Sequence, residues 1–364
     1  MAKKKRKIDS FSADELLGEL RRRELSPVKN RPATLRSVGG GNEAGLTEYS
    51  SGDLAKALQE AQKLVYGVDD RMDAFEIVDD DIAHSASGVA SLIDMVDIED
   101  NGDGTSTIRT VSFKDAQDLC DGERFAAQPT SPFCSGFLVG SRLLATAGHC
   151  IDNNNLARTR FVFGFAMVDK NTPRVTISND DIYSATSIVA HRLESVGADY
   201  AVIKLIRAVT GRAILPLRRT GKIADNREVY VIGHPSGLPL KYAPGAKVRD
   251  NDESEFFVAN LDTYGGNSGS PVFDERTHKV EGILVRGETD FVSNGTCRVS
   301  NVCSTNGCRG EDVTRATEFS DFVPEVDDDS DDASAELGQR VDRLEQAVGG
   351  IAEAVKQIIT KLDE

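Results

Sequence analysis

The stretch Gly265-Gly266-Asn267-Ser268-Gly269-Ser270-Pro271-Val272 decides the fold of this chain, because it places a serine among glycines. Glycine has no Cβ, so the backbone beside Ser268 can turn sharply and aim consecutive N–H groups at one point. Donors arranged in this way stabilise an oxyanion. We therefore predict Ser268 as a nucleophile and the N–H groups of Gly266 and Ser268 as oxyanion donors. The alternative for this composition is an ordinary hairpin turn.

A serine nucleophile needs a base that takes its proton and an acid that orients the base. Of the five histidines, His149 follows a strand-like segment in Leu144-Ala145-Thr146-Ala147-Gly148-His149-Cys150, and we predict it as the base. Asp199 begins the apolar run 200–205, where a strand would anchor a partly buried carboxylate, and we predict it as the orienting acid. His234, between a glycine and a proline, is predicted to have a structural role in a turn.

The order of the three residues along the chain is His149, Asp199, Ser268. Other hydrolase folds use different orders, and the G-x-S-x-G pattern of the nucleophile elbow fails because position 270 is serine. The segment 64–323 also consists of short β-branched and aromatic runs separated by turn residues, which is typical of an all-β barrel or sandwich.

These motifs resemble the trypsin/chymotrypsin family of serine endopeptidases, in particular the bacterial branch that includes the glutamyl endopeptidases. The resemblance rests on residues 134–137, 146–150, 199–205 and 265–271, and on residues 65–71, which are similar to the start of the mature domain in that branch. It implies two six-stranded antiparallel β-barrels, with His149 and Asp199 on the first and Ser268 on the second. It also implies an acyl-enzyme mechanism without metal or organic cofactor, protein or peptide substrates, and a disulfide between Cys134 and Cys150.

By the same resemblance, Asp262, six residues before Ser268, forms the floor of the specificity pocket, and a buried carboxylate there would favour cleavage after Arg or Lys. The pocket would be lined by Leu284, Val285 and Gly287. The glutamyl endopeptidases carry a histidine where this chain has Leu284, which argues against a preference for glutamate. Arg286 or Arg309 could neutralise Asp262. The alternative is that Asp262 is an ordinary turn aspartate or an internal salt-bridge partner.

Activation cannot follow the trypsin scheme, because Asn267 replaces the aspartate that pairs with a freed amino terminus in trypsin-type zymogens. One alternative is self-cleavage after Lys63. The other is that residues 1–63, a helical and flexible extension, are retained and recruit a protein partner.

The C-terminal part of the chain predicts self-association. An acidic linker at 324–336 precedes residues 337–362, where apolar side chains alternate in steps of four and three at Leu337, Val341, Leu344, Val348, Ile351, Val355, Ile358 and Leu362. Such heptad spacing is typical of a coiled coil, and we expect a homo-oligomer whose number of chains stays open. A helix packed back on the barrel is the alternative.

Charge and composition restrict the partners. The formal net charge is -16, and although residues 1–63 hold 13 Lys/Arg against 9 Asp/Glu, the remainder holds 30 against 50. Like-charge repulsion therefore disfavours binding of nucleic acid or an anionic membrane by the main body. The sequence lacks an apolar run of about 18 residues and a signal-peptide core, so we expect a cytoplasmic protein.

The other cysteines and the acidic run 97–104 are the remaining candidates for metal binding. Cys120, Cys297, Cys303 and Cys308 lack the tight pairs of zinc sites, so we predict two further disulfides, reduced or partly formed in a cytoplasm. The acidic run has Ile108 where a calcium loop needs glutamate, which favours a hairpin turn. We thus expect a regulated serine endopeptidase without a metal; the alternative is a catalytically inactive, oligomeric protease-like scaffold.

Overall fold

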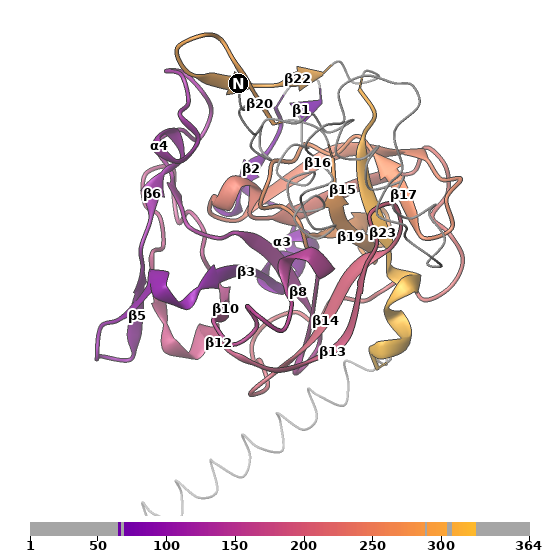
Figure 1. Ribbon diagram of the computed structural model, residues 1–364, viewed down its shortest axis with the longest axis horizontal. Helices are drawn as coiled ribbons and strands as arrows, with labels where there is room; N and C mark the ends of the chain where they lie inside the picture. The colour runs from indigo at the N-terminus through magenta and orange to yellow at the C-terminus, as the bar shows by residue number, and fades with distance from the viewer. Residues whose placement is uncertain (1–64, 67–68, 288–289, 304–307, 325–364) are drawn as a thin grey trace, which may run out of the picture. The chain divides into compact units, whose positions relative to one another are not determined.

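The computed structural model describes residues 65–66, 69–287, 290–303 and 308–324. The predicted N-terminal extension (1–63), nearly all of the acidic linker (324–336) and the coiled coil (337–362) lie outside these residues. Two seven-stranded sheets dominate the described part (Figure 1), which is all-β with few and short helices. None of the helices in the described ranges is long and apolar enough to cross a membrane.

The first sheet carries the histidine and the aspartate. Its strands, in order across the sheet, are β12 (Ile182–Tyr183), β10 (Thr159–Phe163), β3 (Val89–Asp94), β8 (Cys134–Gly140), β9 (Leu143–Thr146), β14 (Asp199–Leu205) and β13 (Ala185–Leu193). Within the described ranges, no strand pairing joins the edge strands β12 and β13, so this sheet is a half-barrel. The prediction of a closed six-stranded barrel here is wrong. The two edge strands are consecutive in the chain, and Ser184 is the one residue between them.

The second sheet carries the serine and closes into a six-stranded barrel, as expected. Its strands, in order, are β15 (Glu228–Gly233), β18 (Pro271–Asp274), β19 (Val280–Arg286), β23 (Glu311–Arg315), β17 (Phe256–Ala259), β16 (Lys241–Asp250) and β2 (Met72–Asp73). Pairing between β15 and β16 closes the barrel, and β2 extends it at the edge of β16.

Smaller elements border the two sheets. They are the parallel pair β1 (Val65–Tyr66) and β22 (Val302–Cys303), the hairpin β4 (Ile98–Asp100) and β5 (Thr105–Ile108) with β11 (Thr176–Ser178), the pairs β6 (Val111–Ser112) with β7 (Pro129–Thr130) and β20 (Phe291–Ser293) with β21 (Arg298–Ser300), and the helices α3 (Asp80–Ser87) and α4 (Phe113–Gln117). The hairpin expected in the acidic run is confirmed, since Asn101 donates its N–H to the Thr105 carbonyl at 3.0 Å.

The largest apolar cluster joins the two sheets. It contains Phe137 and Leu144 from the first sheet together with Tyr230 and Ile283 from the second, all with no exposed surface. A second cluster, which includes Val231 and Val313, fills the closed barrel. Burial of apolar area at about 25 cal/mol per Å² is the main force that holds the sheets against each other, so residues carried by different sheets keep a fixed separation.

Candidate active site

His149 and Asp199 come together at the end of the first sheet. His149 lies in a short 3-10 turn, Gly148–Cys150, directly after β9, and Asp199 is the first residue of the neighbouring strand β14. The imidazole Nδ1 is 2.7 Å from Asp199 Oδ2, and the His149 backbone N–H donates to Asp199 Oδ1 at 3.1 Å. Because an ionised carboxylate only accepts hydrogen bonds, Nδ1 carries a proton and Nε2 is the ring nitrogen directed away from the carboxylate.

The close approach of these two residues requires the glycine before the histidine. A Cβ at Gly148 would lie 2.4 Å from the Arg192 carbonyl oxygen and 2.9 Å from that of Tyr200. The Gly148 carbonyl in turn lies 2.8 Å from His191 Nε2. Strand β13 therefore supports the turn that aims the imidazole.

Asp199 has no exposed surface, and burial alone would raise the pKa of its carboxyl group. The charge and hydrogen bonds of His149, together with the charge of Arg286, outweigh burial and hold this pKa below its ordinary value. Asp199 thus stays ionised at neutral pH and can both orient the imidazole and stabilise it when it is protonated.

Ser268 lies in the loop between β17 and β18 of the closed barrel. Gly266 and Gly269, two residues before and one after it, have φ values of +86° and +88°, in the left-handed region that glycine tolerates. A Cβ at Gly269 would come within 2.0 Å of the Ser135 carbonyl oxygen. These glycines therefore permit both the turn predicted around Ser268 and its tight contact with strand β8 of the other sheet.

Ser135, which sequence reasoning did not identify, joins the two sheets at this loop. Its backbone N–H donates to the Ser268 carbonyl at 2.8 Å, and its hydroxyl donates to the Gly266 carbonyl at 3.2 Å. The same hydroxyl accepts the N–H of His234 at 2.9 Å. The sequence gives no warning of this role, because a small serine in a buried strand is compatible with many environments.

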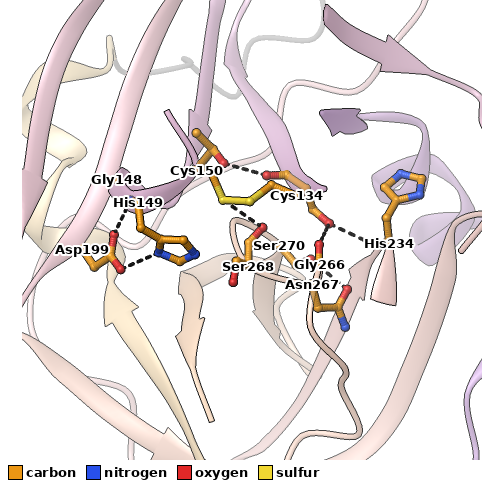
Figure 2. Close-up of a disulfide and its surroundings, with 12 residues drawn as sticks. Cys134, Gly148, His149, Cys150, Asp199, His234, Gly266, Asn267, Ser268 and Ser270 are labelled. Atoms are coloured by element: carbon orange, nitrogen blue, oxygen red, sulfur yellow. Dashed lines mark hydrogen bonds and ion pairs between the residues drawn. A yellow bond between two sulfur atoms is a disulfide. The ribbon is translucent and has the colours of Figure 1, made fainter. Parts of the chain in front are cut away.

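These contacts place the three predicted residues in one neighbourhood. Figure 2 shows the imidazole of His149 with one edge toward Asp199 and the other toward Ser268. A disulfide joins Cys134 to Cys150, and Cys150 Sγ lies 3.7 Å from the Ser268 carbonyl oxygen. The predicted Cys134–Cys150 bridge is therefore present, and it contacts the serine loop as well as flanking the histidine.

The same neighbourhood does not fit a metal ion. The ligand atoms of Cys134, His149 and Cys150 lie within 4.8 Å of one another. Both sulfurs are bonded to each other, however, and a metal binds the thiolate form of cysteine.

The predicted pocket residues are buried around the serine loop. Leu284 and Val285 on β19 have no exposed surface, and Asp262 is 5% exposed. The Asp262 side chain shares a hydrogen bond with Asp70, whose pKa is raised by burial and by the charge of Asp69. Asp70 belongs to the segment that resembles a mature start, so this segment reaches the predicted floor of the pocket.

A second buried carboxylate, which sequence reasoning missed, lies against the predicted pocket. A Cβ at Gly287 would come within 1.7 Å of Glu311 Oε2, and Glu311 has no exposed surface. The glycine therefore leaves room for this carboxylate. The sequence shows two adjacent acidic residues, Glu311 and Asp312, in a strand. This pattern is also common in exposed strands, so it does not indicate a buried carboxylate.

The two arginines considered as neutralising partners of Asp262 both bind Asp312. Arg286 Nε is 3.0 Å from Asp312 Oδ2, and Arg309 donates to Asp312 Oδ1 at 2.5 Å. Arg286 is 4% exposed and also donates to the carbonyls of Glu194 and Gly197. Their hydrogen-bonding capacity is thus directed at least partly to a carboxylate other than Asp262.

All six cysteines are paired. Besides Cys134–Cys150, the disulfides are Cys120–Cys297 and Cys303–Cys308. The prediction of two further disulfides is confirmed, and the partner of Cys120 is now assigned. His234 is 1% exposed and lies 3.0 Å from the Leu238 carbonyl through its Nδ1, which agrees with a structural role.

Residues 134–283 match the family described as a trypsin-like peptidase domain, in agreement with the resemblance predicted from the sequence. Among curated proteins, the secreted RxLR effector protein 73 of Plasmopara viticola is 31% identical over 156 residues, and the alignment covers 38% of this chain and 38% of that protein. The chain thus spans well under half the length of this relative.

Solved structures of similar chains include a Glu endopeptidase in complex with MPD, with 17% identity, a TM-score of 0.41 and coverage of 71% of this chain and 97% of that one. The VesB protease of Vibrio cholerae has 13% identity, a TM-score of 0.44 and coverage of 70% and 66%. Human heparin binding protein has 16% identity, a TM-score of 0.41 and coverage of 66% and 90%.

Proposed function

On the premise that residues 134–283 form a trypsin-like peptidase domain, we propose that this chain is a serine endopeptidase with His149, Asp199 and Ser268 as its catalytic residues. The observation that carries the proposal is the pair of hydrogen bonds from His149 to Asp199, at 2.7 and 3.1 Å, at the end of the sheet that contacts the Ser268 loop. This pair fixes the imidazole in the tautomer that a general base requires.

The reaction follows from these positions. His149 Nε2 takes the hydroxyl proton while Ser268 Oγ bonds to the peptide carbonyl carbon, and the negative charge moves to the carbonyl oxygen. The N–H groups of Gly266 and Ser268 stabilise that oxyanion. When the intermediate collapses, the C–N bond breaks and His149 returns the proton to the amine leaving group. Water, activated by His149, then hydrolyses the acyl-enzyme and regenerates the Ser268 hydroxyl.

Asp199 remains a carboxylate through the cycle. Its lowered pKa favours the charged form beside the imidazolium that exists after His149 takes up a proton. Burial strengthens this interaction, because little water screens the pair.

Cleavage after Arg or Lys is the specificity that the charges favour. Asp262 is the proposed pocket floor, with Leu284, Val285 and Gly287 as its walls, and Asp70 and Glu311 add acidic groups in contact with these residues. A cationic side chain would pair with this negative charge and compensate its burial. A glutamate side chain would be repelled.

Two experiments test the proposed catalytic activity and the proposed cleavage specificity. A fluorophosphonate probe should label the wild-type protein and fail to label Ser268→Ala; an unlabelled wild type would favour the inactive scaffold instead. Mass spectrometry of a digested protein mixture should show cuts after Arg and Lys, and Asp262→Ser should reduce these cuts by about 100-fold or more, in line with the loss of a buried charge pair. Cuts after acidic or apolar residues in the wild type would reject the basic pocket.

Regulation and assembly remain part of the proposal. The N-terminal extension 1–63 would be removed or would recruit a protein partner, and residues 337–362 would form the oligomer. Light scattering of the full chain and of a variant with Leu344→Asp and Ile351→Asp tests assembly, since charges at heptad core positions destabilise a coiled coil. An unchanged mass for the variant would reject this role.

A further inference from the structure

The segment just after the predicted mature start contains a fully buried cation. Arg71, which directly precedes β2, is 1% exposed. Its Nε and a terminal nitrogen donate to the two carboxylate oxygens of Asp69 at 2.8 and 2.7 Å. Such a bidentate pair is the geometry that compensates for the burial of a guanidinium group.

The buried guanidinium stacks on an aromatic residue of the loop that carries Ser268. The Arg71 Cζ atom is 3.8 Å from the centre of the Tyr264 ring, and Tyr264 is itself 1% exposed. A cation over an aromatic face is attracted to it, and the attraction is strongest when both groups are desolvated. The Tyr264 carbonyl accepts the Asn267 N–H at 3.1 Å, so Tyr264 begins the turn that ends at Asn267, directly before Ser268.

Arg124 holds the Arg71 segment from a third side. It donates to the backbone carbonyls of Asp69 and Arg71 at 2.6 and 2.8 Å and forms an ion pair with Asp69 at 3.0 Å. Although burial acts to lower the pKa of Arg71, Tyr264 and Asp69 raise it above its ordinary value. The guanidinium is therefore charged, paired and fixed in place.

In trypsin-type enzymes, the freed amino terminus pairs with an aspartate directly before the nucleophile. Asn267 stands at that position, and its Oδ1 accepts the Ser270 hydroxyl at 3.1 Å inside the turn. In this chain the buried cation that contacts the loop is the side chain of Arg71, and it contacts Tyr264 rather than residue 267.

We propose that Arg71 is a positioning residue that orders the loop 262–268 through Tyr264, and that this internal cation makes the site competent without cleavage before residue 69. This inference rests on the proposed role of Ser268. Its consequence is that removal of residues 1–63 is not the activating step, so these residues act by recruitment of a partner instead.

The test compares Arg71→Met, Arg71→Lys and Asp69→Asn with a matched control, Arg158→Met. Arg158 forms a 2.6 Å ion pair with Asp94 and its side chain is 55% exposed. For each protein, kcat and KM are measured on a lysine ester, together with the folded fraction at the assay temperature and the hydrogen exchange of amides in residues 262–270.

Arg71→Met should lower kcat by about 100-fold with a smaller change in KM, because misplaced oxyanion donors affect the transition state most. Hydrogen exchange in 262–270 should accelerate by about 10-fold or more, Arg71→Lys should recover part of both effects, and the control should match wild type. A folded Arg71→Met protein with unchanged kcat and unchanged exchange overturns the inference. If Arg71→Met does not fold, Asp69→Asn is judged by the same two criteria.

Intact mass spectrometry of the fluorophosphonate-labelled wild type decides the question of cleavage. A label on the full-length chain supports the inference, and a label only on species that begin after residue 63 overturns it. If no species is labelled, the proposed function fails, whereas the exchange comparison still decides whether Arg71 orders the loop.

Discussion

Arg286 on β19 of the closed barrel donates a 2.7 Å hydrogen bond to the carbonyl of Gly197, two residues before Asp199 on the other sheet. The same guanidinium binds Asp312 on β23 and contributes to the lowered pKa of Asp199. The strand beside the serine loop therefore also fixes the segment that precedes Asp199.

Replacement of Arg286 by methionine should lower the free energy of unfolding by about 3 kcal/mol, because it leaves a buried carboxylate with fewer partners. Urea denaturation measures this loss. Arg309→Met is the control, since Arg309 binds the same carboxylate with a side chain that is 46% exposed, and its loss should be below about 1 kcal/mol. Equal losses for both variants would show that burial of Arg286 is not what matters.

Substitution of the proposed catalytic residues should separate chemistry from binding. Ser268→Ala and His149→Ala should each reduce kcat by about 10⁶-fold, and Asp199→Asn by about 10⁴-fold, since the amide holds the imidazole in the wrong tautomer. Steady-state kinetics on an ester substrate measures the changes. A fall of less than 10-fold in Asp199→Asn would contradict the orienting role of Asp199.

The stability of the protein should depend on pH through His234. Burial lowers the pKa of His234 to about 4, although the bond to the Leu238 carbonyl opposes this, while the unfolded chain keeps the ordinary value of 6.5. Below pH 6.5 the unfolded state therefore binds a proton that the folded state does not bind. The free energy of unfolding falls as the pH is lowered from 6.5 to about 4. Between pH 7.5 and pH 5 the loss should be about 2 kcal/mol.

Urea denaturation at both pH values measures this loss, with His234→Gln as the comparison. The variant lacks the titrating group, so its free energy of unfolding should change by about 2 kcal/mol less over the same interval. An identical pH dependence in the two proteins would mean that His234 does not carry the effect.

The disulfides allow a test of both stability and compartment. Loss of Cys120–Cys297, which spans 177 residues, should cost about 5 kcal/mol, and loss of Cys134–Cys150, which spans 16, about 3 kcal/mol, because the longer loop is more constrained in the unfolded chain. Paired Cys→Ser variants in thermal denaturation measure this order. Thiol titration of the protein from its native source tests the predicted cytoplasmic location, since reduced or partly formed bridges leave free thiols and an oxidising compartment leaves none.

The three proposed catalytic residues could be located from the sequence because each is marked locally. Gly148 precedes the histidine, an apolar run follows the aspartate, and glycines flank the serine, as the turn geometries at Gly266 and Gly269 require. The order of the three along the chain then selected the fold. A backbone conformation that requires glycine can be inferred directly from a glycine in the sequence.

The supporting residues could not be predicted, since their roles depend on contacts between distant segments. Ser135 reaches Ser268 across 133 positions of the sequence only because two sheets pack together. Arg71 was part of a resembling stretch, yet nothing local marks its stack on Tyr264. The open first sheet was also missed, because strand runs predict strands and not whether edge strands pair.

The main-chain bond between Ser135 and Ser268 has an evolutionary consequence. Since this bond uses no side-chain atom, substitutions that removed the Ser268 hydroxyl or the His149 imidazole would leave the contact between the two sheets in place. A single substitution that abolished the proposed activity would therefore leave the two sheets joined.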